Sequence, residues 1–211
     1  MSEVRELYGA STGNSLRAAI ALAEAGIEFT PRCLDLLSGD QRAPEYLALN
    51  PLGKAPTFVD HSVSPTLVIN QSNAIMQYAD EQAPGRLSPI EPSAQRYRVY
   101  DRFYFFVTDV IAPSHAAFFL RQIGQQDASA PLNRRALEHL MTADAFLESG
   151  YIAGDAFSMA DISAFTFARS VRDQIDLEKL PRMARWLALI EARPAVKLGM
   201  QAFESKPSSR K

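Results

Sequence analysis

A proline-rich segment, Ala83–Ser93 (APGRLSPIEPS), separates two stretches of this 211-residue chain that differ in periodicity. Three prolines, one glycine and two serines in so short a span are typical of a linker. Strand-length apolar runs alternate with helical patterns before it, whereas helical patterns alone follow it. We therefore expect an N-terminal domain at residues 1–83, a linker at 84–93 and a second domain at 94–211.

The N-terminal stretch predicts an α+β domain with the element order βαβαββα. Gly26 provides a stop signal after the first helix, and polar turns separate the later elements. The first two strands would be parallel through a helical crossover, and the last two would form an antiparallel hairpin. The predicted strands are Arg5–Tyr8, Phe29–Leu34, Ala55–Val59 and Thr66–Ile69, and the predicted helices are Ser15–Ala25, Pro44–Ala48 and Ser72–Gln82.

The C-terminal stretch carries almost no strand signal and predicts an all-α domain. We expect its helices at Gln95–Val110, Arg134–Leu147, Ala160–Gln174 and Arg182–Ala192, and we expect the tail Lys206–Lys211 to fray.

The composition excludes several classes of function. A net charge of -2 provides no basic surface for nucleic acid, and no continuous run of about 18 apolar residues predicts a membrane span. The N-terminus lacks the apolar region of a secretory signal. The single cysteine, Cys33, excludes an internal disulfide, and three scattered histidines have no metal-ligand spacing. We expect a cytoplasmic protein without a metal.

Three loops at the starts of predicted helices or strands contain polar or proline-rich motifs. Thr12-Gly13-Asn14-Ser15 precedes the first helix, where unpaired N–H groups and the helix dipole favour an anion. Asn50-Pro51-Leu52-Gly53-Lys54-Ala55-Pro56 precedes the third strand, and a cis Pro56 would present the Ala55 backbone to a peptide-like ligand. Gln71-Ser72 begins the last helix of the domain. Taken singly, each motif has an equally simple reading as a helix cap or a turn.

The order and spacing of these motifs resemble those of cytosolic glutathione transferases over the whole chain. NPLGKAPTFVD is similar to the family's NPxGKVPxLxD segment, and INQSNAIMQYADEQAP is similar to its L-x-E-S-x-A-I-x-x-Y-L segment. FSMADISAF is similar to the S-x-A-D helix start of the second domain, where Ser158 and Asp161 suit a capping box. The resemblance implies a thioredoxin-like N-terminal domain that binds glutathione as co-substrate and a helical C-terminal domain.

The resemblance also implies which residue activates the glutathione thiol. The first loop is similar to the Thr-x-Asn loop of nu-type bacterial enzymes, which places Thr12 at the activating hydroxyl and Asn14 beside it. Ser15 and Ser11 remain rivals. Cys33 falls in the second strand, and we expect it to be a buried apolar residue rather than a nucleophile.

The remaining glutathione contacts follow from the same resemblance. Gln71, in place of the family's common Glu, and Ser72 would hold the γ-glutamyl end, Ala55 beside the cis Pro56 would pair with the cysteinyl unit, and Lys54 and Gln41 would reach the glycyl carboxylate. Tyr104, Thr108 or His115 would line part of the acceptor pocket.

The expected partners are glutathione and either a small hydrophobic electrophile or a disulfide or peroxide, in a detoxifying homodimer. The alternatives are a non-catalytic binding module on the same fold and a glutathione-dependent isomerase. The hydroxyl loop, Pro56 and Ser72 argue against the binding module, and the lack of a Ser-Ser-Cys loop argues against the isomerase.

Overall fold

A computed structural model describes residues 4–204 of the chain, so the predicted tail at 206–211 lies outside the described residues. The described chain divides into two compact units, one made of residues 4–86 with 193–204 and the other of residues 87–192. The first unit therefore includes the end of the chain, which the sequence assigned to the second domain.

The first unit has a four-stranded sheet with the order β2-β1-β3-β4. β1 is parallel to β2 and antiparallel to β3, and β3 is antiparallel to β4. The predicted order βαβαββα is confirmed, with a short 3₁₀ turn added at Asp40–Arg42. The elements are β1 (Arg5–Gly9), α1 (Gly13–Glu24), β2 (Thr30–Cys33), α2 (Pro44–Leu49), β3 (Thr57–Asp60), β4 (Leu67–Ile69) and α3 (Ser72–Gln82).

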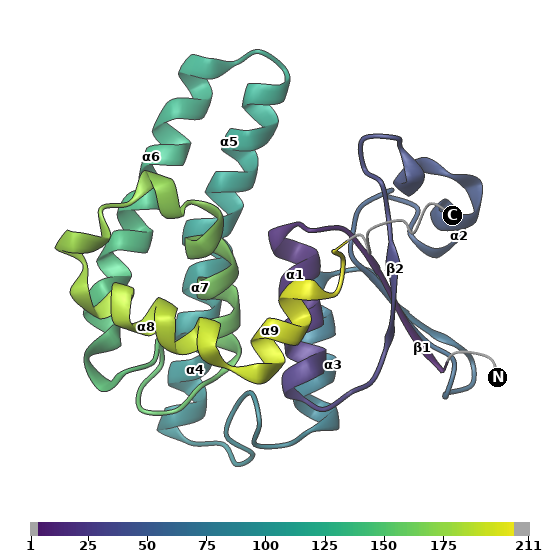
Figure 1. Ribbon diagram of the computed structural model, residues 1–211, viewed down its shortest axis with the longest axis horizontal. Coiled ribbons are helices and arrows are strands. Elements are labelled where there is room, and N and C mark those ends of the chain that lie inside the picture. Colours follow the sequence, from purple (N-terminus) through teal and green to yellow (C-terminus); the bar gives the residue numbers. More distant parts are fainter. Residues whose placement is uncertain (1–3, 205–211) are drawn as a thin grey trace, which may run out of the picture. The chain divides into compact units, whose positions relative to one another are not determined.

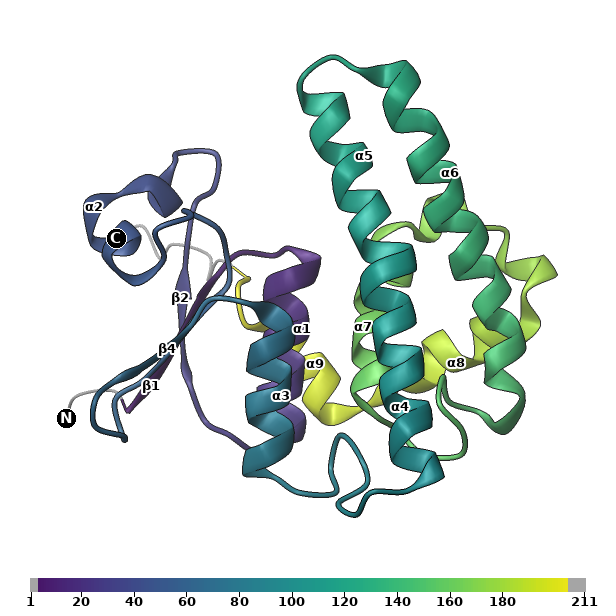
Figure 2. The same cartoon turned by 180° about the vertical axis from the view of Figure 1, so that it is seen from behind.

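Helices cover both faces of this sheet. α1 and α3 lie side by side on one face, and α2 lies beyond the other (Figure 1 and, from behind, Figure 2). Leu7 is fully buried, and the Tyr8 ring lies 5.9 Å from the ring of Tyr46 on α2. This alternation along β1 is the period of two that a strand covered on both faces requires.

The sequence did not predict α9 (Pro194–Gln201), which packs on α1 within the first unit. Gly199 allows this close approach, because an added Cβ would lie 2.7 Å from the Ile20 backbone. Arg193, just before α9, donates to both carboxylate oxygens of Glu24 at 2.6 and 2.8 Å. The helix is short and begins at a proline, so its pattern was too brief to separate from the preceding helix.

The second unit is helical, as expected, but its helices differ in extent. The predicted helix Gln95–Val110 continues through a π-helical segment into α5, which was not predicted. Pro113 lies in the first turn of α5, where proline is tolerated. The elements are α4 (Ala94–Phe105), the π segment (Phe106–Ile111), α5 (Ala112–Gln122), α6 (Gln126–Thr142), a 3₁₀ segment (Ala143–Ser149), α7 (Met159–Ser170) and α8 (Pro181–Ala192).

The continuous helix Ala94–Gln122 is, among residues 4–204, the one helix long and apolar enough to cross a membrane by length and composition. One helix of this kind is weak evidence for a membrane span, and the sequence has no continuous run of about 18 apolar residues there. Helices in the cores of folded domains meet the same criterion, and within this unit α4 packs on α7 and α5 on α6.

The predicted capping box at the start of α7 is confirmed. Ser158 donates from its N–H and its hydroxyl to Asp161 Oδ2, at 2.9 and 3.0 Å. Asp161 Oδ1 accepts from the Ile152 N–H and from Trp186 Nε1, both at 2.9 Å. Burial raises the pKa of this carboxyl to about 6, despite four hydrogen bonds that lower it.

Candidate functional site

The three motifs found in the sequence meet at one edge of the sheet. Tyr8 near the end of β1 lies opposite Thr57 at the start of β3, and Phe58 lies opposite Ile69 at the end of β4. The loop after β1, the turn before β3 and the start of α3 therefore adjoin one another. We call this the Thr12 edge of the sheet.

Thr12 is the N-cap residue of α1 and has an extended backbone. Among residues 4–204, no side chain is seen to cap the first turn of this helix, so its N–H groups stay available to a ligand. The Thr12 hydroxyl is partly exposed and donates to Ser15 Oγ at 3.2 Å. Thr12 therefore does not act as a simple side-chain cap of α1.

The two rival serines are placed differently from Thr12. Ser15 is fully buried, and its Oγ accepts from the Ala10 N–H at 3.4 Å as well as from Thr12. Ser11 is exposed and donates to the carbonyl of Phe203, just beyond α9, at 3.3 Å. Of the three hydroxyl groups, that of Thr12 alone is both at the helix N-cap and open to solvent.

A buried cation behind the loop was missed by the sequence analysis. Arg17 is 3% exposed and donates to Asn14 Oδ1 at 3.0 Å. Burial lowers the pKa of Arg17 to about 10, so the guanidinium is still protonated at neutral pH. Its signal was an Arg three residues after Asn14 in an otherwise Ala- and Leu-rich helix, a position where fully buried charge is rare.

The Ala55–Pro56 bond is cis, as expected. The carbonyl of the preceding Lys54 accepts two short hydrogen bonds, from the Tyr46 hydroxyl and from Asn50 Nδ2, both at 2.6 Å. Among residues 4–204, Ala55 has no hydrogen bond within the chain. The turn is thus fixed on one side and leaves the Ala55 backbone free for a ligand.

A buried polar network links this turn to the residues before α3. Thr57 Oγ1 lies 2.9 Å from the Tyr46 hydroxyl and donates to Asn70 Oδ1 at 2.9 Å. Asn70 Nδ2 in turn donates to the Leu49 carbonyl at 2.9 Å. Tyr46 and Thr57 are almost fully buried, and burial raises the pKa of the Tyr46 phenol, which therefore stays a donor at neutral pH. None of these side chains was singled out in the sequence.

The start of α3 is open in the same way as the start of α1. Gln71 is its N-cap residue, without a side-chain cap, and Ser72 is its first residue and 7% exposed. The next side chain, Asn73, has a buried Oδ1 without a hydrogen-bond partner. A buried oxygen in this state is uncommon in native proteins and is expected where a ligand supplies the missing donor.

Gln41 and Lys54 border the turn from outside. Gly53 has a φ of +57°, and an added Cβ would lie 2.9 Å from the Gln41 carbonyl, so the segment carrying Gln41 packs against the turn. Gln41 Nε2 donates to the Leu36 carbonyl at 3.2 Å, while its Oε1 is buried without a partner. The Lys54 side chain is exposed.

Two predicted lining residues belong to the second unit. Tyr104 is 48% exposed on α4, and the Thr108 hydroxyl has two acceptors for its single hydrogen, the Tyr104 carbonyl at 2.9 Å and Asp109 Oδ2 at 2.7 Å. Their part in an acceptor pocket stays a prediction.

Cys33 was expected to be buried, and this is wrong: it is exposed. It ends β2, the edge strand of the sheet, where Pro31 and Arg32 are exposed as well. Among residues 4–204, no cluster of three His, Cys, Asp or Glu side chains is arranged to hold a metal ion.

Family models match both halves of the chain. Residues 3–81 match the glutathione S-transferase N-terminal domain, and residues 109–198 match the glutathione S-transferase C-terminal domain. The chain is 31% identical over 191 residues to glutathione S-transferase D7 of Drosophila melanogaster, covering 86% of this chain and 82% of that protein.

Solved structures have the same fold. A glutathione transferase from Burkholderia graminis, with two glutathione molecules bound per subunit, superposes with a TM-score of 0.83 and 25% identity, covering 96% of this chain and 89% of that one. A glutathione transferase from Pseudomonas putida, with one glutathione disulfide bound per subunit, superposes with a TM-score of 0.81 and 24% identity, covering 93% and 90%.

Proposed function

Because this chain belongs to the glutathione S-transferase family, we propose that it binds glutathione at the Thr12 edge of the sheet and activates the glutathione thiol. The observation that carries this proposal is the Thr12 hydroxyl at an N-cap whose first-turn N–H groups no side chain occupies. A thiolate at that position would receive one hydroxyl hydrogen bond and the positive end of the α1 dipole.

The free energies of these two contacts are large enough to lower the thiol pKa. A thiol with a pKa of about 8.5 is only about 3% ionised at pH 7, and lowering its pKa by ~2 units requires about 2.7 kcal/mol of preference for the anion. A hydrogen bond to a charged group supplies about 1.5–3 kcal/mol, and a helix N-terminus about 0.3–1 kcal/mol. The Thr12 hydroxyl would turn from Ser15 Oγ to the thiolate, while Ser15 Oγ keeps the Ala10 N–H as its donor.

Asn14 supports this role indirectly. Its side-chain oxygen is held by Arg17, whose positive charge lies behind the first turn of α1. We assign Asn14 and Arg17 to the electrostatic stabilisation of the thiolate rather than to proton transfer. No general base is required, because a lowered thiol pKa suffices.

The rest of glutathione is assigned to the segments that surround Thr12. Gln71 and Ser72 would hold the γ-glutamyl carboxylate at the open start of α3, and the buried Asn73 Oδ1 is a suitable acceptor for the ammonium group that the family's Glu would otherwise bind. Ala55 would pair its free backbone with the cysteinyl unit. Lys54 and Gln41 would contact the glycyl carboxylate.

The reaction proposed is attack of the thiolate on a hydrophobic electrophile, or glutathione-dependent reduction of a disulfide or peroxide. The glutathione disulfide bound by the Pseudomonas putida transferase supports the disulfide version. Tyr104 and Thr108 are our candidates for contacts to the acceptor. We further propose a cytoplasmic homodimer, whose mass by light scattering should be twice the 23.3 kDa of the chain.

The test is the substitution Thr12→Val, which keeps the size of the side chain and removes the donor. Loss of a bond worth about 1.5–3 kcal/mol should raise the pKa of the bound thiol by about 1–2 units. Thiolate formation is followed by ultraviolet absorbance across a pH series, together with conjugation of a model aryl halide. Activity at neutral pH should fall about tenfold or more and recover in part at higher pH.

Ser15→Ala and Ser11→Ala are the matched controls and should have milder effects. If either abolishes thiolate formation while Thr12→Val does not, that serine is the activating residue. The non-catalytic alternative makes a separate prediction, because a binding module would either fail to bind glutathione in calorimetry or bind it without lowering the thiol pKa.

A further inference from the structure

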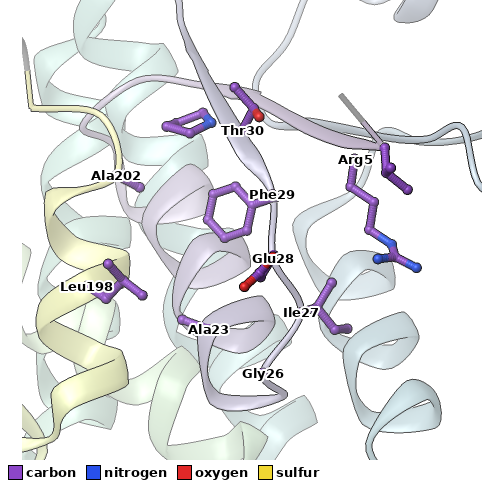
Figure 3. A pocket seen from close by; sticks show the side chains of 11 residues that line it. Arg5, Ala23, Gly26, Ile27, Glu28, Phe29, Thr30, Leu198 and Ala202 are labelled. Carbon is purple, nitrogen blue, oxygen red and sulfur yellow. The ribbon is translucent and has the colours of Figure 1, made fainter. Parts of the chain in front are cut away.

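A cavity of about 800 Å³ lies in the first unit at the opposite end of β1 from Thr12. Its walls come from the end of α1, the loop that follows, the start of β2 and one side of α9 (Figure 3). Arg5 at the beginning of β1 lines it, whereas Gly9 at the end of β1 adjoins the Thr12 loop. Small organic ligands occupy protein pockets of about 300–1,000 Å³, so this cavity is large enough for one.

Most of the lining is apolar and unusually exposed. Leu198 on α9 is 64% exposed and Val4 is 52% exposed, although both are large aliphatic residues. Ile27 and Phe29 line the cavity from the loop between α1 and β2. Exposed apolar side chains that gather around a hollow are typical of a binding surface rather than of ordinary solvent-facing positions.

The two charged residues of the lining, Arg5 and Glu28, differ in their partners. Arg5 is engaged elsewhere, because its Nε donates to the buried carboxylate of Asp60 at 3.1 Å and its second guanidinium nitrogen to Ser62 Oγ at 3.4 Å. Glu28 is exposed and has no ion pair or hydrogen bond among residues 4–204. An incoming ligand therefore meets one uncompensated carboxylate.

β2, an edge strand of the sheet, contributes one backbone carbonyl to the lining. The Leu34 N–H donates to the Gly9 carbonyl, and Gly9 is paired with Cys33. Because alternate residues of a strand direct their backbone groups to opposite sides, Pro31, two residues before Cys33, directs its backbone to the free edge of β2. Proline has no N–H and presents only its carbonyl there. The same proline hinders the addition of another strand, which disfavours an extended peptide as the occupant.

We propose that this cavity binds a small organic amine, with a ring-sized apolar body on Ile27, Phe29 and Leu198 and an ammonium group at Glu28. The chemical complementarity is a cation for the Glu28 carboxylate and an apolar body for an apolar floor. The site is separate from the Thr12 edge and does not depend on glutathione chemistry.

The experiment uses three ligands that share a naphthyl ring and differ in charge. Binding of 1-naphthylmethylamine, 1-naphthylmethanol and 1-naphthylacetate to the full chain is measured by calorimetry with glutathione present. The amine should bind more tightly than the alcohol, and the acetate more weakly. Glu28→Gln should weaken the amine by about two- to fivefold at low salt, the range for an exposed ion pair, and leave the alcohol unchanged. High salt should reduce this difference.

Two further variants separate the site from non-specific effects. Leu198→Ser should weaken the amine and the alcohol alike, because it removes part of the shared apolar floor. Glu45→Gln on α2 removes another exposed carboxylate and should change neither. Glu28 and Leu198 are exposed, so these variants should fold.

The proposal is overturned if the wild-type chain does not bind the amine, if the acetate binds as tightly, or if Glu28→Gln and Glu45→Gln act alike. Glutathione-dependent activity should be the same in Glu28→Gln and the wild type. A chain without transferase activity that still binds the amine through Glu28 would contradict the proposed function and leave this site standing.

Discussion

The ring of Phe203 lies directly against Gly9, where an added Cβ would be 2.5 Å from the ring Cζ. Gly9 is required here for its small size and not for a left-handed backbone, because its φ is not positive. The Phe203 carbonyl also accepts a hydrogen bond from the Ser11 hydroxyl. Phe203, which follows α9, therefore contacts both Gly9 and Ser11 at the start of the Thr12 loop. The end of the chain therefore helps to position that loop.

Gly9→Ala should lower the free energy of unfolding by about 1–3 kcal/mol, the usual effect of overpacking. Urea unfolding measures it. In a Phe203→Leu background, which removes the atom in conflict, the same substitution should have a smaller effect, and a double-mutant cycle gives the difference. If Gly9→Ala lowers the free energy of unfolding equally in both backgrounds, the Phe203 ring is not the reason that position 9 requires glycine.

Tyr46→Phe should weaken glutathione binding by disturbing the turn that carries Ala55. It removes the donor to the Lys54 carbonyl and leaves the buried Thr57 hydroxyl with one partner fewer, which should lower the free energy of unfolding by about 1–3 kcal/mol. KM for glutathione should rise more than kcat falls, since the reacting thiol is held elsewhere. Tyr97→Phe, at a tyrosine that is 64% exposed, should change neither, and a matching loss there would exclude a specific role for Tyr46.

Asp60 should make the protein more sensitive to acid. Burial raises the pKa of this carboxyl, but hydrogen bonds from Ser62, Tyr78 and Arg5 outweigh it and hold the pKa at about 2. The folded-state pKa is below the ordinary 3.8, so the stabilisation is complete above about pH 4 and is lost as the pH falls towards 2. The shift corresponds to about 2 kcal/mol.

Asp60→Asn should accordingly destabilise the protein at pH 6 and only about half as much at pH 3, as followed by urea unfolding at both values. Glu81→Gln, an exposed carboxylate on α3, is the control and should show no such difference. The comparison of variant with wild type is needed because Asp161 acts in the opposite sense. Its raised pKa of about 6 makes its contribution fall as the pH rises from about 4 to 6. A constant loss for Asp60→Asn at both pH values would contradict the assignment.

Asp161→Asn should be strongly destabilising, by about 2–4 kcal/mol. Each carboxylate oxygen accepts two hydrogen bonds, so an amide necessarily turns its NH₂ group towards two buried donors. Trp186 is the only tryptophan in the sequence, and its fluorescence reports both the local change and the unfolding. Asp155→Asn, at an exposed position four residues before the start of α7, should have no effect. The prediction would be wrong if Asp161→Asn had the fluorescence spectrum and the unfolding midpoint of the wild type.

Local signals in the sequence were sufficient to predict the bounds of the elements that have clear start and stop residues. The predicted bounds of the helix Ser72–Gln82 are those of α3, because a strong apolar period is followed by a proline-rich linker. The third strand was expected from Ala55, but it begins at Thr57, after the cis Pro56. Cis geometry at this bond followed from the family resemblance and not from propensity.

The side chains that act between segments were not visible in the sequence. Tyr46 and Asn50 have helical i, i+4 spacing at the end of α2, but their meeting with the Lys54 carbonyl depends on the turn after α2, which no spacing rule gives. The exposure of Cys33 depends on β2 being the edge strand, which is decided by strand order and not by the apolar pattern of β2 itself. Both cases depend on tertiary pairing, which overrides local preference.

The assignment of α9 to the first unit has a consequence for how the protein is made. The segment that covers Ile20 and Gly9 of the first unit is synthesised more than 100 residues after the strands that it completes. The nascent first unit must therefore wait with one flank of α1 uncovered while the whole helical unit is synthesised. Deletion of residues 193–211 should expose that flank, and a chaperone that binds apolar surface would then recognise the truncated chain in preference to the full one.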